Sequence, residues 1–122
     1  IFFPNIAEGK LLSGEQHPEK IIDKLVDFFP SSIIVLKLGA EGVLIRAGKK
    51  TIHVEAIVDS IIDSTGAGDS FAGAFLAKYL TGVTPAQAGA FAVKISSWVV
   101  NHIGSRPQGD DELKSLIDSF DL

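Results

Sequence analysis

The chain has 122 residues, the usual size of one globular domain, and it leaves no room for a second complete one. Hydrophobic residues make up 46% and charged residues 21%, so the chain is expected to fold rather than stay disordered. The net charge is −4 and the lysines are scattered, so no basic stripe points to nucleic acid or to an anionic membrane as a partner.

The compartment and the ends of the chain allow further expectations. The sequence contains no cysteine, which excludes disulfides and thiolate chemistry and suits a reducing, cytoplasmic location. No apolar run approaches the roughly 20 residues that cross a bilayer, so no membrane partner is predicted. The chain opens on Ile1-Phe2-Phe3-Pro4 without an initiator Met or the basic flank of a signal peptide, and it is expected to begin inside a longer protein.

Two helices are predicted at the start of the chain. Asn5 can cap a short helix that ends at Ser13-Gly14, and Pro18 lies in the first turn of the next helix. Apolar residues recur at helical spacing between positions 21 and 29, which predicts one buried face for this second helix.

Three strands are predicted next. Residues 33–38 form a continuous apolar, β-branched run, the pattern of a central strand buried on both faces. Residues 42–46 and 51–55 flank a turn that contains Gly48, so they predict a hairpin, and its strands are expected to be less buried.

Helices dominate the second half of the sequence. Small and apolar residues recur over 67–80 and 85–101, and Thr84-Pro85 supplies an N-cap followed by proline at the first helical position. A last helix over 110–120 opens with acidic residues, which the positive end of a helix dipole favours. Mixed helices and strands indicate a layered α/β fold.

Residues 63–71 carry the strongest chemical signal. They read Asp-Ser-Thr-Gly-Ala-Gly-Asp-Ser-Phe and lead from an apolar stretch straight into a helix. Gly66 and Gly68 have no Cβ, so their amides can approach an anion closely at the positive end of that helix. Asp69 lies in the first helical turn, where its carboxylate can take the proton of an attacking hydroxyl group. The alternative is a plain loop followed by an acidic first turn, because Asp is favoured at helix starts.

The segment 63–71 resembles the second signature of the ribokinase-like, PfkB-type carbohydrate kinases, with Ser64 in place of the commoner Thr. Three more segments follow in the family's order. Residues 5–8, Asn-Ile-Ala-Glu, resemble the motif associated with magnesium and phosphate; residues 37–42 resemble the turn at the nucleotide phosphates and base; and Phe91-Ala92 with residues 104–107 resemble the helix and closing turn beside the adenine.

The resemblance implies a three-layer αβα ribokinase-like fold, of which residues 1–122 form the C-terminal portion. The N-terminal half that holds the acceptor, and its β lid, are then absent from these residues. It also implies ATP-dependent phosphorylation of a hydroxyl group on a small-molecule sugar or nucleoside.

The same resemblance implies roles for single residues. Asp69 is the general base, and Gly66, Ala67 and Gly68 form the anion hole. Asn5 and Glu8 act on Mg²⁺ through water, and Asp63 helps to hold a monovalent cation such as K⁺. The residues implied for nucleotide binding are Lys37, Gly39, Gly42, Thr65, Phe91 and Val93.

Several of these roles have plainer alternatives. Asn5 and Glu8, three apart at a helix start, are also the pattern of a helix cap with a solvated Glu. Asp63 can simply form a turn. Lys37 stands where Thr or Ser is frequent in the family, so it can reach phosphate as a point charge or remain a solvated strand-end lysine. Val93 stands where Asn or His is common, which makes any contact with the base apolar.

A second hypothesis for the function is a catalytically silent fragment that still binds nucleotide or acts as an interaction domain. A C-terminal portion would leave one sheet edge open, so either self-association or binding of the missing N-terminal half is expected. A dinucleotide-binding oxidoreductase is disfavoured, because no Gly-x-Gly-x-x-Gly follows a strand. The three histidines are widely separated, and surface or structural roles are expected for them.

Overall fold

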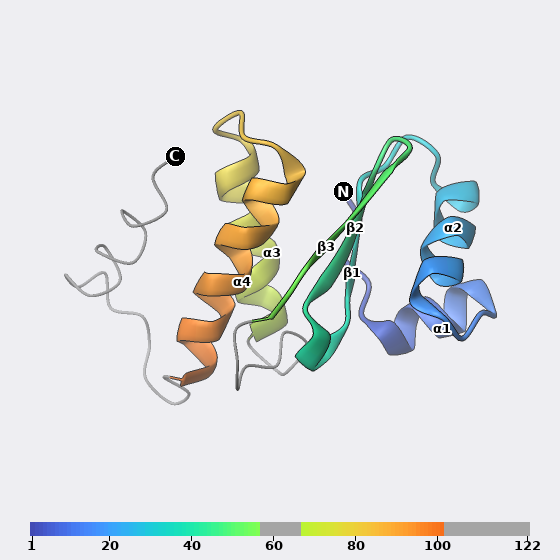
Figure 1. Ribbon diagram of the computed structural model, residues 1–122, viewed down its shortest axis with the longest axis horizontal. Helices are drawn as coiled ribbons and strands as arrows, with labels where there is room; N and C mark the ends of the chain where they lie inside the picture. The colour runs from blue at the N-terminus through green and yellow to red at the C-terminus, as the bar shows by residue number, and fades with distance from the viewer. Residues whose placement is uncertain (57–66, 102–122) are drawn as a thin grey trace.

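The computed structural model of the chain describes residues 1–56 and 67–101 (Figure 1). In this part a three-stranded antiparallel sheet lies between two pairs of helices, which confirms the layered α/β fold. In chain order the elements are α1 (Ile6–Ser13), α2 (Pro18–Phe28), β1 (Ile34–Lys37), the 3₁₀ turn η1 (Gly39–Glu41), β2 (Val43–Ala47), β3 (Lys50–Val54), α3 (Ala67–Tyr79) and α4 (Pro85–Asn101). Helices α1 and α2 cover one face of the sheet, and α3 and α4 cover the other.

Helix α1 begins and ends at its predicted capping residues. The Oδ1 atom of Asn5 accepts the N–H of Glu8 at 2.8 Å, and Oε1 of Glu8 accepts the N–H of Asn5 at 2.9 Å. This reciprocal capping box satisfies two amides that the helix leaves unpaired. Gly14 ends the helix in the left-handed region, with φ 73°. Pro18 opens α2, as the sequence predicts.

Strand β1 is buried on both faces, which confirms its prediction. Ile34 and Leu36 point to the layer of α1 and α2, where they join Ile21 in one apolar cluster. Val35 points the other way and joins Phe71 of α3 in a second cluster. The N-terminal segment, residues 1–5, runs parallel to β1 through bridges at Ile34 and Lys37, so β1 has a neighbour on each side.

Strand β2 is more buried than the sequence predicts. Val43 and Ile45 are fully buried and Leu44 is 7% exposed, so the expectation of a less buried strand is wrong for β2. The reason is its position, since β2 pairs with both β1 and β3 and is covered by helices on both faces. The expectation holds for β3, whose residues alternate between exposed and half-buried.

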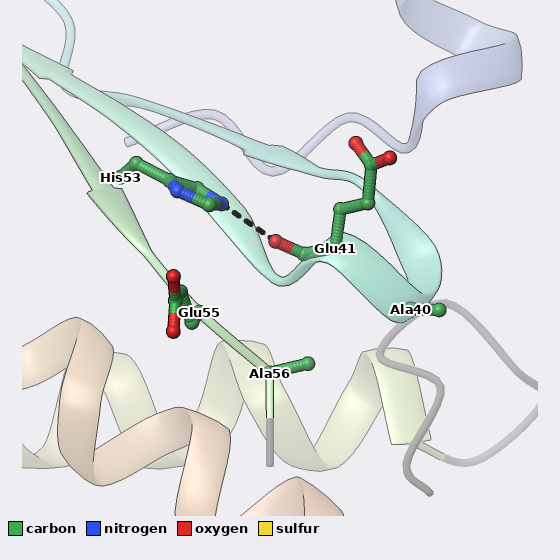
Figure 2. Close-up of a pocket in the computed structure, with 5 residues that line it drawn as sticks. All are labelled: Ala40, Glu41, His53, Glu55 and Ala56. Atoms are coloured by element: carbon green, nitrogen blue, oxygen red, sulfur yellow. Dashed lines mark hydrogen bonds between the residues drawn. The ribbon is translucent and has the colours of Figure 1, made fainter. Parts of the chain in front are cut away.

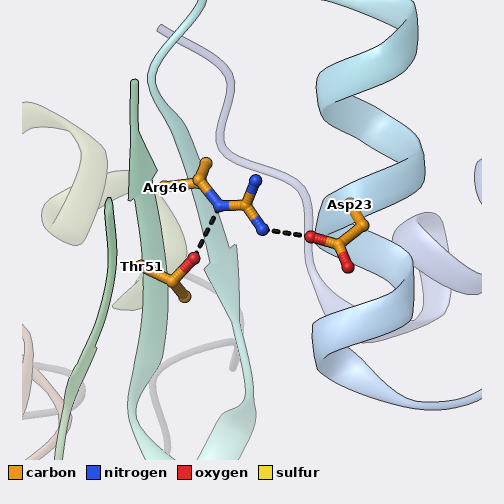
Figure 3. A network of polar contacts seen from close by, with 3 residues as sticks. All are labelled: Asp23, Arg46 and Thr51. Atoms are coloured by element: carbon orange, nitrogen blue, oxygen red, sulfur yellow. Dashed lines mark hydrogen bonds and ion pairs between the residues drawn. The ribbon is translucent and has the colours of Figure 1, made fainter. Parts of the chain in front are cut away.

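The hairpin of β2 and β3 is tied to helix α2 by one polar network (Figure 3). The Nε atom of Arg46 on β2 donates to Oγ1 of Thr51 on β3 at 2.6 Å, and its guanidinium also pairs with the carboxylate of Asp23 on α2. Gly48 makes the turn with φ 61°, which places Ala47 opposite Lys50 and fixes the register.

Helices α3 and α4 pack together as an antiparallel pair (Figure 1). Thr84 caps α4 in a second reciprocal pair, donating its N–H to Oε1 of Gln87 at 3.0 Å and accepting the N–H of Gln87 at 3.2 Å. On α3, Phe71 and Phe75 are fully buried and both meet the ring of Phe3 edge-on. These contacts hold α3 against the N-terminal segment. The predicted helix over 110–120 lies outside the described residues.

Candidate functional site

The segments that carry most of the predicted site residues lie at one edge of the layered structure. The carboxyl end of β1, the turn η1, the start of α1 and the start of α3 all lie at the same edge (Figure 1). Two contacts connect them: Lys37 at the end of β1 is bridged to Asn5 at the start of α1, and Phe71 in the first turns of α3 contacts Phe3. The end of β1 and the starts of α1 and α3 therefore lie at one edge, although they are far apart in the sequence.

The turn after β1 depends on two glycines. Gly39 has φ 66° and Gly42 has φ 88°, conformations that side chains with a Cβ rarely adopt. The end of β3 also passes so close to Gly42 that a Cβ there would overlap the carbonyl oxygen of Val54 and lie 2.7 Å from the nitrogen of Ala56. Gly42 is thus required by packing, and it fixes the place of the turn.

Lys37 is the last residue of β1 and lies beside the start of α1. Its N–H donates to the carbonyl oxygen of Pro4 at 2.9 Å, which anchors it beside the start of α1. Because side chains alternate along a strand, Lys37 shares the sheet face of Val35, the face covered by α3 and α4. It is half-buried. Its ammonium group therefore belongs to the side of the sheet from which α3 starts.

The capping box on α1 decides how Asn5 and Glu8 can contribute to a metal site. Each side chain already binds the main chain of the other, so the capping alternative is confirmed. Glu8 is nevertheless exposed, and a carboxylate accepts more than one partner. Oxygen ligands of this kind fit Mg²⁺ that keeps most of its waters. Among the residues whose side chains the structure describes, no three His, Asp or Glu side chains meet as a metal-binding group.

The signature segment is described only from its helical end. Helix α3 begins at Ala67, so Gly68 and Asp69 belong to its first turn, as predicted. Phe71, two residues further on, is fully buried against Phe3, which fixes where the helix starts. The predicted residues Asp63, Thr65 and Gly66 lie outside the described residues.

Helix α4 carries the two residues predicted beside the base. Phe91 is 6% exposed and Val93 is 3% exposed, and Val93 belongs to the apolar cluster between α4 and the sheet. The ammonium of Lys78 on α3 lies over the Phe91 ring, 5.3 Å from its centroid. The structure therefore places both residues inside the helical layer.

A depression of about 320 Å³ opens beside the glycine turn (Figure 2). It is lined by Ala40, Glu41, His53, Glu55 and Ala56, none of which is predicted from the sequence as a site residue. The register of the hairpin could have revealed this depression. Because Leu44 pairs with His53, the residues that follow His53 on β3 lie beside residues 40 and 41, which precede Leu44.

Comparison with known proteins identifies the family. A sequence model described as "pfkB family carbohydrate kinase" matches residues 1–111. The chain belongs to the PfkB family. It is similar to the 2-dehydro-3-deoxygluconokinase of Bacillus subtilis (strain 168), with 40% identity over 84 residues, which cover 68% of this chain and 26% of that protein. The 2-dehydro-3-deoxygluconokinase of Thermoproteus tenax is 36% identical over 105 residues, covering 86% of this chain and 30% of that protein.

Solved structures support the same family and fold. A ribokinase from Thermotoga maritima has a TM-score of 0.78 at 26% identity, covering 98% of this chain and 41% of that chain. A probable sugar kinase from Rhizobium etli CFN 42 has a TM-score of 0.77 at 27% identity, and the match covers 96% of this chain and 34% of that chain. This PfkB-family chain spans about a quarter to two fifths of the length of the curated relatives it matches. No helix in the described part of the chain has the length and apolar composition needed to cross a membrane.

Proposed function

We propose that this PfkB-family chain carries the phosphoryl-transfer portion of an ATP-dependent sugar kinase. The observation that supports the proposal most is the meeting of three family segments at one edge: Asn5 at the start of α1, Lys37 at the end of β1, and the first turn of α3. Helix starts and glycine turns offer amides to anions, and Lys37 adds a positive charge on the same side of the sheet. Such an edge suits the phosphates of a nucleotide.

In the proposed reaction, Asp69 is the general base. It accepts the proton of an acceptor hydroxyl while the hydroxyl oxygen bonds to the γ-phosphorus of ATP and the bond to the β-phosphate oxygen breaks, releasing ADP. The amides of Gly66, Ala67 and Gly68 stabilise charge on the transferred phosphoryl group. Mg²⁺, placed through water by Asn5 and Glu8, supplies positive charge for the ATP phosphates.

The remaining assignments concern binding. Gly39 and Gly42 let the turn approach the nucleotide with its main chain, and Thr65 extends that contact. Because Phe91 and Val93 are buried in α4, their proposed contribution is an apolar support beneath the base rather than a polar contact. Their substitution should therefore affect affinity for all nucleoside triphosphates alike. A monovalent cation such as K⁺, held in part by Asp63, is proposed as an activator of the anion hole.

Sugars are the acceptors that the relatives favour. The two relatives with 40% and 36% identity are both 2-dehydro-3-deoxygluconokinases, and others are ribokinases or a 6-phosphofructokinase. We therefore place 2-dehydro-3-deoxygluconate first among candidate acceptors, followed by ribose, fructose 6-phosphate and a nucleoside.

An open edge supports the proposal that residues 1–122 are one portion of a larger kinase. Residues 1–5 pair with β1 on one side, and no described strand pairs on the other. Helix α3 is the helix beside this edge, because its rings contact Phe3. Leu76 on α3 and Leu80, which directly follows the helix, are 38% and 82% exposed, and Ile1 is 47% exposed. An open sheet edge with exposed apolar side chains can pair with a further strand.

The proposed occupant of this edge is the portion of a PfkB chain that the match does not cover, which would hold the acceptor. The chain spans only 34% and 41% of two solved relatives. The remaining part of such a kinase is therefore large enough to pair with this edge. Without that portion, we expect the chain to self-associate through the same edge. A monodisperse species of 13.0 kDa in light scattering would contradict this expectation.

The coverage also supports the second candidate function, a portion that binds nucleotide without transferring phosphate by itself. One experiment separates the two. ATP binding to the chain is measured by calorimetry with Mg²⁺, and ADP release is measured with each acceptor in turn. Turnover with a sugar supports the kinase, and binding without turnover supports the nucleotide-binding portion. If the chain does not bind ATP, both functions are refuted.

A further inference from the structure

The glycine turn is attached to strand β3 by a side chain that no family motif includes. The Nε2 atom of His53 lies 2.6 Å from the carbonyl oxygen of Glu41, the last residue of η1 (Figure 2). A carbonyl oxygen only accepts, so the ring nitrogen must carry the proton and donate. The contact joins residues twelve positions apart, and it adds to the close approach of Gly42 and β3.

The turn is closed by one strong hydrogen bond, from the N–H of Leu38 to the carbonyl oxygen of Gly42 at 2.8 Å, whereas the hydrogen bonds inside it are longer. The N–H of Glu41 donates to the carbonyl of Leu38 at 3.3 Å, and the N–H of Gly42 donates to that of Gly39 at 3.2 Å. Both are longer than the usual 2.9–3.0 Å, in keeping with the poorer geometry of 3₁₀ turns. The contact from His53 therefore supports the turn at Glu41, in its middle, where the turn's own hydrogen bonds are long.

The contact is not a by-product of core packing. His53 is exposed on β3, and it borders both the depression beside Ala56 and a second one of about 200 Å³ beside Pro18. A ring with open space on two sides could adopt other rotamers, so its position against Glu41 reflects the hydrogen bond itself. In Figure 2 the Glu41 carboxylate points away from His53, and only its main chain takes part.

We propose that His53 is a positioning residue that holds the turn at 39–42 in the shape that binds the nucleotide. The inference rests on the proposed function, because the turn matters only if it binds ATP. His53 does not touch the reacting atoms; it acts through the main chain of Glu41. Its loss should loosen the turn and weaken ATP binding, and it should leave the fold intact because the side chain is outside the core.

The test uses three variants of the chain. His53→Val removes the donor and suits a strand, and His53→Gln restores an N–H donor on a side chain of similar reach. Lys50→Gln is the matched control, since it changes an exposed side chain at the other end of β3. Amide hydrogen exchange at Glu41 and Gly42 reports on the turn, and calorimetry with ATP and Mg²⁺ reports on binding.

The expected result is faster exchange at both amides in His53→Val and a two- to tenfold weaker affinity for ATP, roughly the effect of one net hydrogen bond. His53→Gln should recover part of both, and Lys50→Gln should match the wild type. Unchanged exchange in His53→Val, or unchanged affinity with the wild type binding ATP, would overturn the inference alone. If the wild type binds no ATP, the proposed function fails, and a faster exchange would then leave His53 with a purely structural role.

Discussion

Replacement of Gly42 by alanine tests whether packing requires glycine in the turn. The main chain there has φ 88° and ψ −130°, so any residue with a Cβ pays about 1–2 kcal/mol for the backbone alone. The new methyl group would also overlap the carbonyl of Val54, and it cannot rotate away because it is fixed to the backbone. Overpacking of this kind adds about 1–3 kcal/mol. Gly42→Ala should therefore lower the free energy of unfolding by about 3 kcal/mol or more.

The assay is urea unfolding followed by the fluorescence of Trp98, the single tryptophan. Gly48→Ala is the matched control, since Gly48 also has a positive φ, 61°, but a Cβ there meets nothing within 4 Å. It should cost only about 1 kcal/mol. Equal losses for the two variants would refute the argument, because the approach of β3 to Gly42 would then have no energetic consequence.

Three further predictions follow from single residues. Asp69→Asn keeps the shape of the side chain and removes the proton acceptor, so phosphate transfer should fall by at least about 10²-fold in an ADP-release assay while ATP affinity changes little. Asn5→Ala should lower the free energy of unfolding in urea by about 0.5–2 kcal/mol, whereas Asn5→Asp should keep the cap and the stability. Phe75→Ala removes a fully buried ring that packs between Phe3 and Tyr79, and it should cost about 3–5 kcal/mol in the same assay, far more than Leu76→Ala on the exposed side of α3.

The features predicted best from the sequence are those fixed within a few residues. The caps at Asn5 and Thr84 depend on side chains three positions away, and the turn at Gly48 depends on the positive φ of that glycine. The structure confirms all three. The burial of β2 depends on α4, whose residues come about 40 positions later, so the alternation within the hairpin could not reveal it. Neighbouring residues therefore predict where helices and strands begin and end, whereas the burial of a strand depends on helices that come from distant parts of the chain.

The candidate site likewise has a part that the sequence predicts and a part that it does not. The sequence predicts Lys37, Gly39 and Gly42 as one turn, and the bridge to Asn5 brings a second motif beside it. The contribution of His53 could not be predicted from its own neighbours, because its partner is a main-chain oxygen twelve residues away. A contact of that kind requires the register of the hairpin, which the turn at Gly48 sets and a motif does not contain.

The magnesium role proposed for Asn5 and Glu8 has to be compatible with the capping box that the two residues form. Direct chelation by both side chains would draw them away from the main chain and lose the capping box, at a cost of about 0.5–2 kcal/mol. The proposed water-mediated role would have no such cost, because the capping bonds would stay in place and the exposed carboxylate could still accept a hydrogen bond from a metal-bound water. Mg²⁺ gives up its waters reluctantly, so it suits this second arrangement. In that proposed arrangement, the cap would fix the direction of the Glu8 carboxylate before an ion binds.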